Sequence, residues 1–90
     1  METIILNPTN GRKSFYGKCK VEKDGNIYAL YSYNVRVARY DEQSKDLEIY
    51  EYSSTTTGTH INAFLDFFGI EKMTKQQILS YIEYTNKLNN

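Results

Sequence analysis

The sequence has little cysteine, histidine or proline and no tryptophan, and these shortages exclude several classes of protein. The single cysteine, Cys19, has no partner within the chain for a disulfide, so this is not a disulfide-stabilised scaffold. We expect Cys19 to be a small buried hydrophobe of a protein from a reducing compartment. A zinc site needs more histidine or cysteine ligands than one of each, and we expect neither a metal nor a cofactor.

Net charge is also absent, because 11 basic and 11 acidic residues cancel. No global field therefore draws the protein to nucleic acid or to an anionic membrane, and partners must be recognised locally. The longest apolar run at the N-terminus is Ile4–Leu6, far short of the ~18 residues that span a bilayer. We expect a cytoplasmic protein with no signal peptide and no membrane segment.

Tyrosine, in contrast, is abundant, with nine residues beside four phenylalanines in a chain of 90. A chain of this length supports one hydrophobic core, so we expect residues 1–90 to form a single compact domain. A deep catalytic cleft is hard to build at this size. Binding is therefore favoured over catalysis.

Alternating polar and apolar residues predict a four-stranded antiparallel meander over the first half of the chain. Asp24-Gly25 is a favoured hairpin turn, and Asn34 allows a second tight connection. The period-two pattern places Phe15, Cys19 and Val21 on one face. The predicted strands are 14–22, 26–33, 35–41 and 46–52, with a short additional strand at Ile4–Leu6.

The period changes to that of a helix after residue 59, where Ile61, Phe64, Leu65 and Phe68 follow i, i+3, i+4, i+7 spacing. Gly69 ends this helix, and Thr74 with Gln77 has the spacing of a capping box. The predicted helices are 60–68 and 75–88. The fold class is thus α+β, with both helices packed on one face of the sheet.

The segment between the last strand and the first helix, Ser53–Thr59, contains more hydroxyl side chains than a helix start requires. Thr57 or Thr59 is the predicted N-cap. The additional hydroxyl side chains have two interpretations: they are architectural, or they help backbone N–H groups to hold an anion. They include Ser53, Thr55 and Thr56. The only histidine, His60, follows directly, and it is either structural, part of a recognition surface, or catalytic.

The strand tyrosines cannot all point inward, because successive side chains of a strand point to opposite faces. We expect a sheet face with Tyr28, Tyr40, Tyr50, Tyr52 and Arg36 to bind a partner, since tyrosine offers a large contact area at low entropic cost. Cross-strand packing on a solvated face is the alternative. Stacking of single-stranded nucleic acid is a further alternative, with phosphate contacts from Arg36, Arg39, Lys18 and Lys20.

The region 32–70 resembles an uncharacterised domain of small bacteriophage and plasmid proteins. Its pattern is SYN-x-x-VA, a hairpin, and then YS-x-TT-x-x-H-I-x-x-F-L. Where the pattern often has a basic residue before the histidine, this chain has Thr59. The matching residues are Ser32, Tyr33, Asn34, Val37, Ala38, Tyr52, Ser53, Thr55, Thr56, His60, Ile61, Phe64 and Leu65.

The resemblance implies an origin in a mobile element and no established activity. We therefore expect a non-enzymatic protein of the bacterial cytoplasm that binds a host protein and inhibits a defence system, as anti-CRISPR proteins do. The alternative is an accessory protein that binds nucleic acid or nucleotides. An uncovered outer strand would also allow a homodimer. The expected binding residues are Tyr28, Arg36, Tyr40, Tyr50, Tyr52, Ser53, Thr55, Thr56 and His60.

Overall fold

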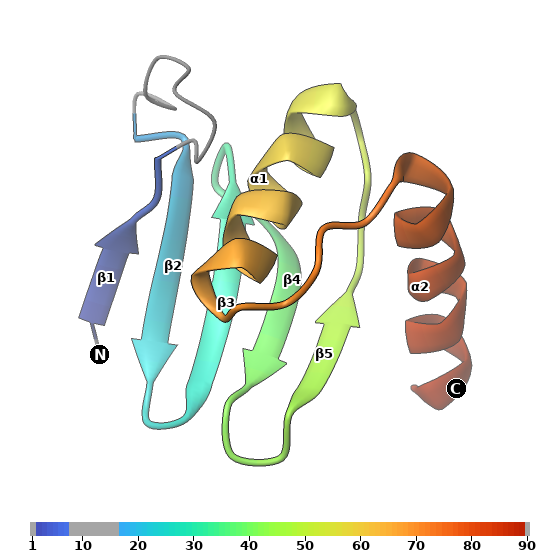
Figure 1. The fold of residues 1–90 in the computed structure, drawn as a ribbon. Helices are drawn as coiled ribbons and strands as arrows, with labels where there is room; N and C mark the ends of the chain where they lie inside the picture. The colour runs from blue at the N-terminus through green and yellow to red at the C-terminus, as the bar shows by residue number, and fades with distance from the viewer. Residues whose placement is uncertain (1, 8–16, 90) are drawn as a thin grey trace.

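The computed structural model describes residues 2–7 and 17–89 of the chain. These residues form a five-stranded antiparallel sheet with the strand order β1-β2-β3-β4-β5, followed by two helices (Figure 1). The sheet is a simple meander, because every strand pairs with its neighbour in sequence. The elements are β1 (Glu2–Ile5), β2 (Cys19–Asp24), β3 (Ile27–Ser32), β4 (Val35–Asp41), β5 (Asp46–Ile49), α1 (Thr55–Phe67) and α2 (Lys75–Leu88).

The hairpin turns contain residues with a left-handed backbone. Gly25, in the turn between β2 and β3, has φ +62°, and Tyr33 and Asn34 between β3 and β4 have φ 53° and 68°. Two consecutive positive φ values match a type I′ turn, whose twist suits an antiparallel hairpin. In the third turn the Asp41 carboxylate accepts the backbone N–H of Gln43 at 3.0 Å.

A β-bulge interrupts the pairing of β3 with β4. Leu30 lies opposite Ala38 and Tyr31 lies opposite Arg36, so Val37 is the extra residue. Val37 and Ala38, although consecutive, are both buried in the core. The bulge thereby returns Arg36 to the face that Arg39 occupies, whereas strict alternation would have turned these two arginines to opposite faces.

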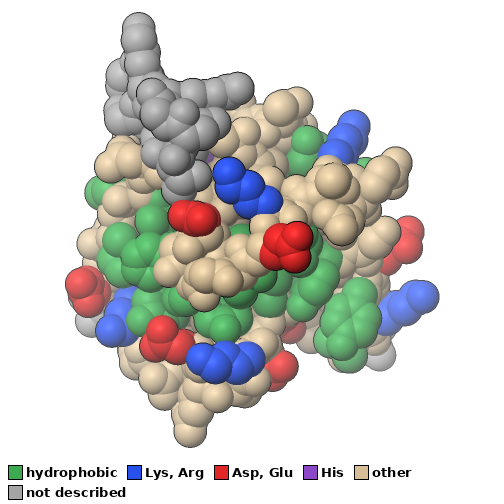
Figure 2. Space-filling view, viewed as in Figure 1, with side chains coloured by type: hydrophobic (Ala, Val, Ile, Leu, Met, Phe, Trp, Pro, Cys, Tyr) green, Lys and Arg blue, Asp and Glu red, His purple; other side chains and the backbone are tan. Residues whose placement is uncertain are grey.

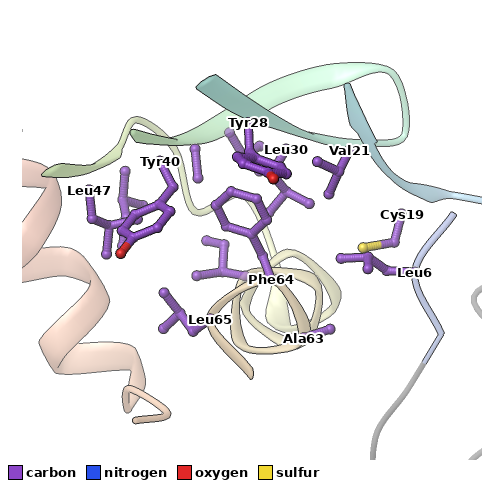
Figure 3. Close-up of a cluster of buried hydrophobic side chains, with 14 of the residues drawn as sticks. Leu6, Cys19, Val21, Tyr28, Leu30, Tyr40, Leu47, Ala63, Phe64 and Leu65 are labelled. Carbon is purple, nitrogen blue, oxygen red and sulfur yellow. The ribbon is translucent and has the colours of Figure 1, made fainter. Parts of the chain in front are cut away.

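The core lies between the sheet and α1, which crosses β3 and β4 on one face (Figure 1). Figure 3 looks onto the end of α1 and shows Phe64 pointing up from the helix between Tyr28, Leu30 and Tyr40 of the sheet. Phe68 completes this aromatic group, with ring centroids 4.8 Å from Tyr28 and 4.4 Å from Tyr40. Aromatic residues of the strands thus supply much of the core.

The second helix packs along the outer edge of β5 (Figure 1). The Thr85 hydroxyl accepts the backbone N–H of Ile49 at 3.2 Å, and the Tyr81 hydroxyl donates to the Leu47 carbonyl at 3.0 Å. Ile78 brings the apolar side of α2 into the core. Backbone groups that an edge strand would leave unpaired are therefore satisfied by side chains of α2.

The predicted α+β class and the meander are confirmed, and the short N-terminal strand is a full member of the sheet. Strand 35–41 and helix 75–88 have the predicted bounds. Predicted strands 26–33 and 46–52 extend beyond the observed β3 and β5. Predicted strand 14–22 starts before β2 and ends two residues before it does, and residues 14–16 lie outside the described part. The expectation that both helices lie on one face holds for α1, whereas α2 follows the sheet edge.

The start of α1 was predicted wrongly, because the helix begins at Thr55 and not at residue 60. The N-cap is Ser54, whose hydroxyl accepts the Thr57 N–H, rather than Thr57 or Thr59. The first turn of the helix consists largely of hydroxyl residues, so it lacks the apolar pattern on which the prediction relied. The side chains of this turn form local hydrogen bonds. The predicted stop at Gly69 (φ +70°) and the capping box of Thr74 with Gln77 are both confirmed.

The buried hydrogen bond between α2 and β5 gives a first prediction. Thr85→Val removes the hydroxyl that accepts the Ile49 N–H. Thr85 is only 1 % exposed, so water has no room to replace the lost acceptor. We expect the free energy of unfolding to fall by about 1–3 kcal/mol in a urea titration. Thr85→Ser keeps the hydroxyl and is the matched control; an equal loss in both variants would contradict the interpretation.

Gly58 gives a second prediction, because a Cβ at this position would lie 2.6 Å from the Tyr52 ring. Gly58→Ala should destabilise the protein by about 1 kcal/mol through this clash, although alanine is the better helix former. In a Tyr52→Ala background the same change should stabilise it, because only the helix propensity remains. Unfolding free energies of the four proteins form a double-mutant cycle. Additive effects would show that the ring contact is irrelevant.

Candidate functional site

The face of the sheet opposite α1, here called the open face, is left uncovered by the two described helices. Its residues follow from the strand register, because residues opposite each other share a face. The core row Val21, Leu30, Ala38 and Ile49 points to α1, so the adjacent rows point away. The rows of the open face are Lys20–Tyr31–Arg36, Glu22–Ala29–Arg39–Glu48 and Asp24–Ile27–Asp41–Asp46.

Charge is unevenly spread over these three rows. The first row holds two cations beside Tyr31, the middle row holds both signs, and the last row holds three aspartates. The open face therefore has a cationic, aromatic end and an acidic end, although the whole chain is neutral. On the helix-covered side, in contrast, charged side chains of both signs are interspersed (Figure 2).

A connected polar cluster joins residues of β4 and β5 to Tyr50, which directly follows β5, and it spans the cationic and middle rows. The Arg36 guanidinium lies 5.7 Å from the centroid of the Tyr50 ring, and the Tyr50 hydroxyl donates to Glu48 at 2.7 Å. Glu48 also pairs with Arg39, whose Nη1 lies 3.6 Å from its carboxylate. Tyr31, on β3, lies directly opposite both Lys20 and Arg36. This arrangement presents two tyrosines among fixed cations.

The cluster alters the proton affinities of its own members. The hydrogen bond from Tyr50 is the main cause that lowers the pKa of the Glu48 carboxyl. Burial, together with the hydrogen bond to Glu48, raises the pKa of Tyr50 to about 12. Glu48 is thus ionised and Tyr50 is neutral at physiological pH, so the tyrosine donates a charge-assisted hydrogen bond and its ring stays in place.

The structure does not bring the predicted binding tyrosines together. Tyr28 and Tyr40 are opposite each other on the helix-covered face and are each only 6 % exposed, which makes them core residues. Tyr52 is partly buried against Gly58, with Lys75 5.8 Å from its ring centroid. Of the predicted face, only Tyr50 and Arg36 share the open side. The expectation of one face with all four tyrosines is therefore wrong.

Tyr31 is the residue that sequence reasoning overlooked in choosing this surface. Its odd spacing from Tyr28 already indicates that the two point to opposite faces. The bulge that places Arg36 beside Tyr31 has no comparable signal in the sequence. The companion prediction for β2 is confirmed for Cys19 and Val21, which are both fully buried, whereas Phe15 lies outside the described residues.

His60 is a buried residue, with 1 % exposure, and is not part of an accessible recognition surface. Its Nδ1 lies 2.7 Å from the Ser32 hydroxyl, and its backbone carbonyl faces the Cys19 thiol at 4.0 Å. Burial lowers the pKa of its imidazole. The side chain is held as a neutral ring between α1 and β3, as the architectural interpretation requires.

The hydroxyl segment is mostly explained by the first turns of α1. Ser53 and Thr57 hydroxyls lie 2.8 Å apart, Ser54 caps the helix, and the Thr59 hydroxyl donates to the Thr55 carbonyl at 3.1 Å. Ser53, Ser54, Thr55 and Thr56 are exposed. Gly58 makes room for the Tyr52 ring and not for a ligand.

The open face also adjoins a groove between β5 and α2. Arg39 and Glu48 line it on the sheet side, and Tyr84 and Leu88 line it on the helix side. Tyr84 and Leu88 are 54 % and 61 % exposed. The groove thus extends the mixed aromatic and charged surface of the sheet onto α2.

Groups that could do covalent chemistry are poorly placed in the described part of the chain. Burial raises the pKa of the Cys19 thiol to about 12, so it is not a thiolate nucleophile. No group of three or more His, Cys, Asp or Glu residues suited to a metal occurs within 2–7 and 17–89. Among these same residues, no helix combines the length and hydrophobicity that crossing a bilayer requires.

Comparison with known proteins identifies a family. The sequence model of a family of unknown function, DUF8033, matches residues 4–80, which is most of the chain and more than the segment that carried the resemblance. Neither the curated proteins nor the solved structures provide a significant match.

The buried histidine predicts how stability depends on pH. Because burial lowers the pKa of folded His60 below the value of about 6.5 in the unfolded chain, the unfolded state binds more protons in acid. The free energy of unfolding should therefore be highest above that pH and should fall as the pH decreases below about 6.5. Urea titrations at each pH measure this slope. His60→Gln should remove it, and an unchanged slope would assign it to other groups.

Proposed function

The chain belongs to DUF8033, and we propose that it is a binding protein that engages another protein through the open face of its sheet. One observation carries the proposal: the open face presents Tyr31 and Tyr50 beside Arg36 at the cationic end, with Arg39 in the adjacent row. Tyrosine and arginine are the residues most enriched at energetic centres of protein interfaces.

The rigidity of this cluster supports a binding role. Glu48 fixes both Tyr50, through its hydroxyl, and Arg39, through an ion pair. Side chains that are already held lose little conformational entropy when a partner binds.

A protein partner is favoured over nucleic acid by the balance of charge. Arg39 is already paired with Glu48, and the aspartate row lies on the same face as the cations. A phosphate backbone that follows the strands would meet these carboxylates. A partner protein with both signs would satisfy both ends. Stacking of bases on Tyr31 and Tyr50, with phosphates at Lys20 and Arg36, is the second candidate function.

The finer identity of the partner rests on the sequence resemblance. The pattern of residues 32–70 resembles that of small bacteriophage and plasmid proteins, and on this resemblance we propose that the protein acts in the bacterial cytoplasm on a host protein. An effector of a defence system, such as a CRISPR nuclease, is the partner class that this origin favours. No catalytic step is part of the proposal, since the thiol of Cys19 and the imidazole of His60 are both buried.

The test is affinity capture with the tagged protein from bacterial lysate, with and without nuclease, read by mass spectrometry. We expect a stoichiometric partner that survives nuclease. With this partner purified, Tyr31→Ala/Tyr50→Ala should weaken binding at least tenfold, because truncation of such anchors costs about 2 kcal/mol or more. Arg36→Glu should have an effect of similar size.

Two variants on other surfaces are the matched controls. Phe67→Ala removes an exposed aromatic ring from the helix-covered side, and Lys72→Glu reverses an exposed charge before α2. Both should bind as the original protein does, and circular dichroism should be unchanged in all variants. Wild-type affinity of the double tyrosine variant would disprove the open-face proposal. A partner that is lost with nuclease, with salt-sensitive binding of oligonucleotides, would favour the second candidate.

A further inference from the structure

The two edges of the sheet are treated differently, and the difference concerns a surface that the proposed function does not use. At β5 the edge is closed by α2, through the Thr85 hydroxyl on the Ile49 N–H and the Tyr81 hydroxyl on the Leu47 carbonyl. At β1, the other edge, no described residue pairs with the outer side of the strand (Figure 1). Within residues 2–7 and 17–89, the sheet therefore has one closed edge and one uncovered edge.

The register identifies the backbone groups that face outward from β1. The Leu6 N–H donates to the Cys19 carbonyl at 3.0 Å, which makes Leu6 and Cys19 a hydrogen-bonded pair. Hydrogen-bonded pairs alternate along an antiparallel ladder, so Ile4 also bonds to β2. Thr3 and Ile5 then direct their N–H and C=O groups away from the sheet. Four backbone groups are in position to pair with another strand.

The side chains of β1 do not protect this edge. Edge strands that avoid association usually carry lysine, proline, an inward-pointing charge or a bulge. β1 pairs regularly with β2 over four residues, and its only charge is that of Glu2 at its start. Thr3, Ile4 and Ile5 are β-branched residues that favour strands, and Ile5 is 50 % exposed on the open face.

We infer that a second copy of the chain pairs with β1 in antiparallel orientation, and that the two sheets join into one. Thr3 of each copy then lies opposite Ile5 of the other and exchanges both hydrogen bonds, while the two Ile4 residues meet on the two-fold axis. This register is self-complementary, as a two-fold interface requires. It pairs every residue of β1 with a residue of the second copy.

Charge complementarity favours a second copy as the occupant. In this register the two Glu2 residues lie at opposite ends of the new strand pair, about 14 Å apart along the strand. On the open face, the row that contains Lys20 and Ile5 of one copy continues into the row with Thr3 and Glu22 of the other. The cationic row of each open face thus continues into the row of its neighbour that contains Glu22 and holds both signs. No pair of like charges meets at the junction.

The short strand also sets the strength of the dimer. A junction of four-residue strands buries less than the 1,200 Å² or so of a standard interface, so the dimer belongs to the weak class. Analytical ultracentrifugation of the purified full chain should show a mass that rises with concentration from 10.5 kDa toward twice that value. A monomer at every concentration up to the submillimolar range would overturn the inference.

A pair of variants assigns the dimer to this edge. Thr3→Pro removes an outward N–H without breaking a bond to β2, because proline is tolerated where the N–H of an edge strand faces solvent. It should abolish the dimer and keep the circular dichroism spectrum. Thr3→Val keeps the N–H and the β-branched shape, and it should dimerise as the original chain does. A dimer that persists in Thr3→Pro would place the interface elsewhere and refute the assignment.

Cross-linking tests the register without relying on that variant. Ile4→Cys places two thiols in a non-hydrogen-bonded pair across the axis, where Cα atoms are about 4.5 Å apart and a disulfide can form. We expect a covalent dimer under mild oxidation. Glu2→Cys, with its thiols about 14 Å apart, is the control that should stay monomeric. The native thiol does not interfere, because Cys19 is fully buried. Cross-linking of both variants alike, or of neither, would exclude this register.

Discussion

The fold depends on one constraint: two short helices cannot cover both faces and both edges of a five-stranded sheet. The chain places α1 across β3 and β4 and uses α2 to close the edge at β5. The character of each face and of the β1 edge follows from that distribution. One face becomes a core of aliphatic and aromatic side chains, while the other face and the β1 edge must have a composition that tolerates water or suits a partner.

The polar groups that enter the core show how closely it is built. His60 meets Ser32, Thr85 meets the backbone of Ile49, and no buried side-chain nitrogen or oxygen of the described residues lacks a partner. Such satisfied groups add specificity of packing, because any shift of α1 or α2 would leave a buried donor or acceptor unpaired. The only histidine of the chain is therefore better understood as part of the frame between α1 and β3 than as a reactive group.

The open face differs in kind from this core. Its tyrosines are held by a carboxylate and by arginines, and its charges are sorted along the strands and not mixed. Solubility alone would not require either feature, and like charges gathered in one row repel one another. They are consistent with a surface that meets a complementary one, and the uncovered β1 edge lies on the same sheet.

The sequence by itself determined the local elements: the turns at Gly25 and Asn34, the bounds of β4 and α2, the capping box at Thr74 and the stop at Gly69. These depend on φ preferences and on hydrogen bonds within a few residues, which are written in the order of side chains. Only the tertiary structure decided which tyrosines are exposed. The faces of β3 and β4 are set by the docking of α1 and by the bulge at Val37, and both depend on contacts between distant residues. The burial of His60 likewise depends on a distant residue. Its hydrogen-bond partner Ser32 lies on a strand 28 positions earlier in the chain.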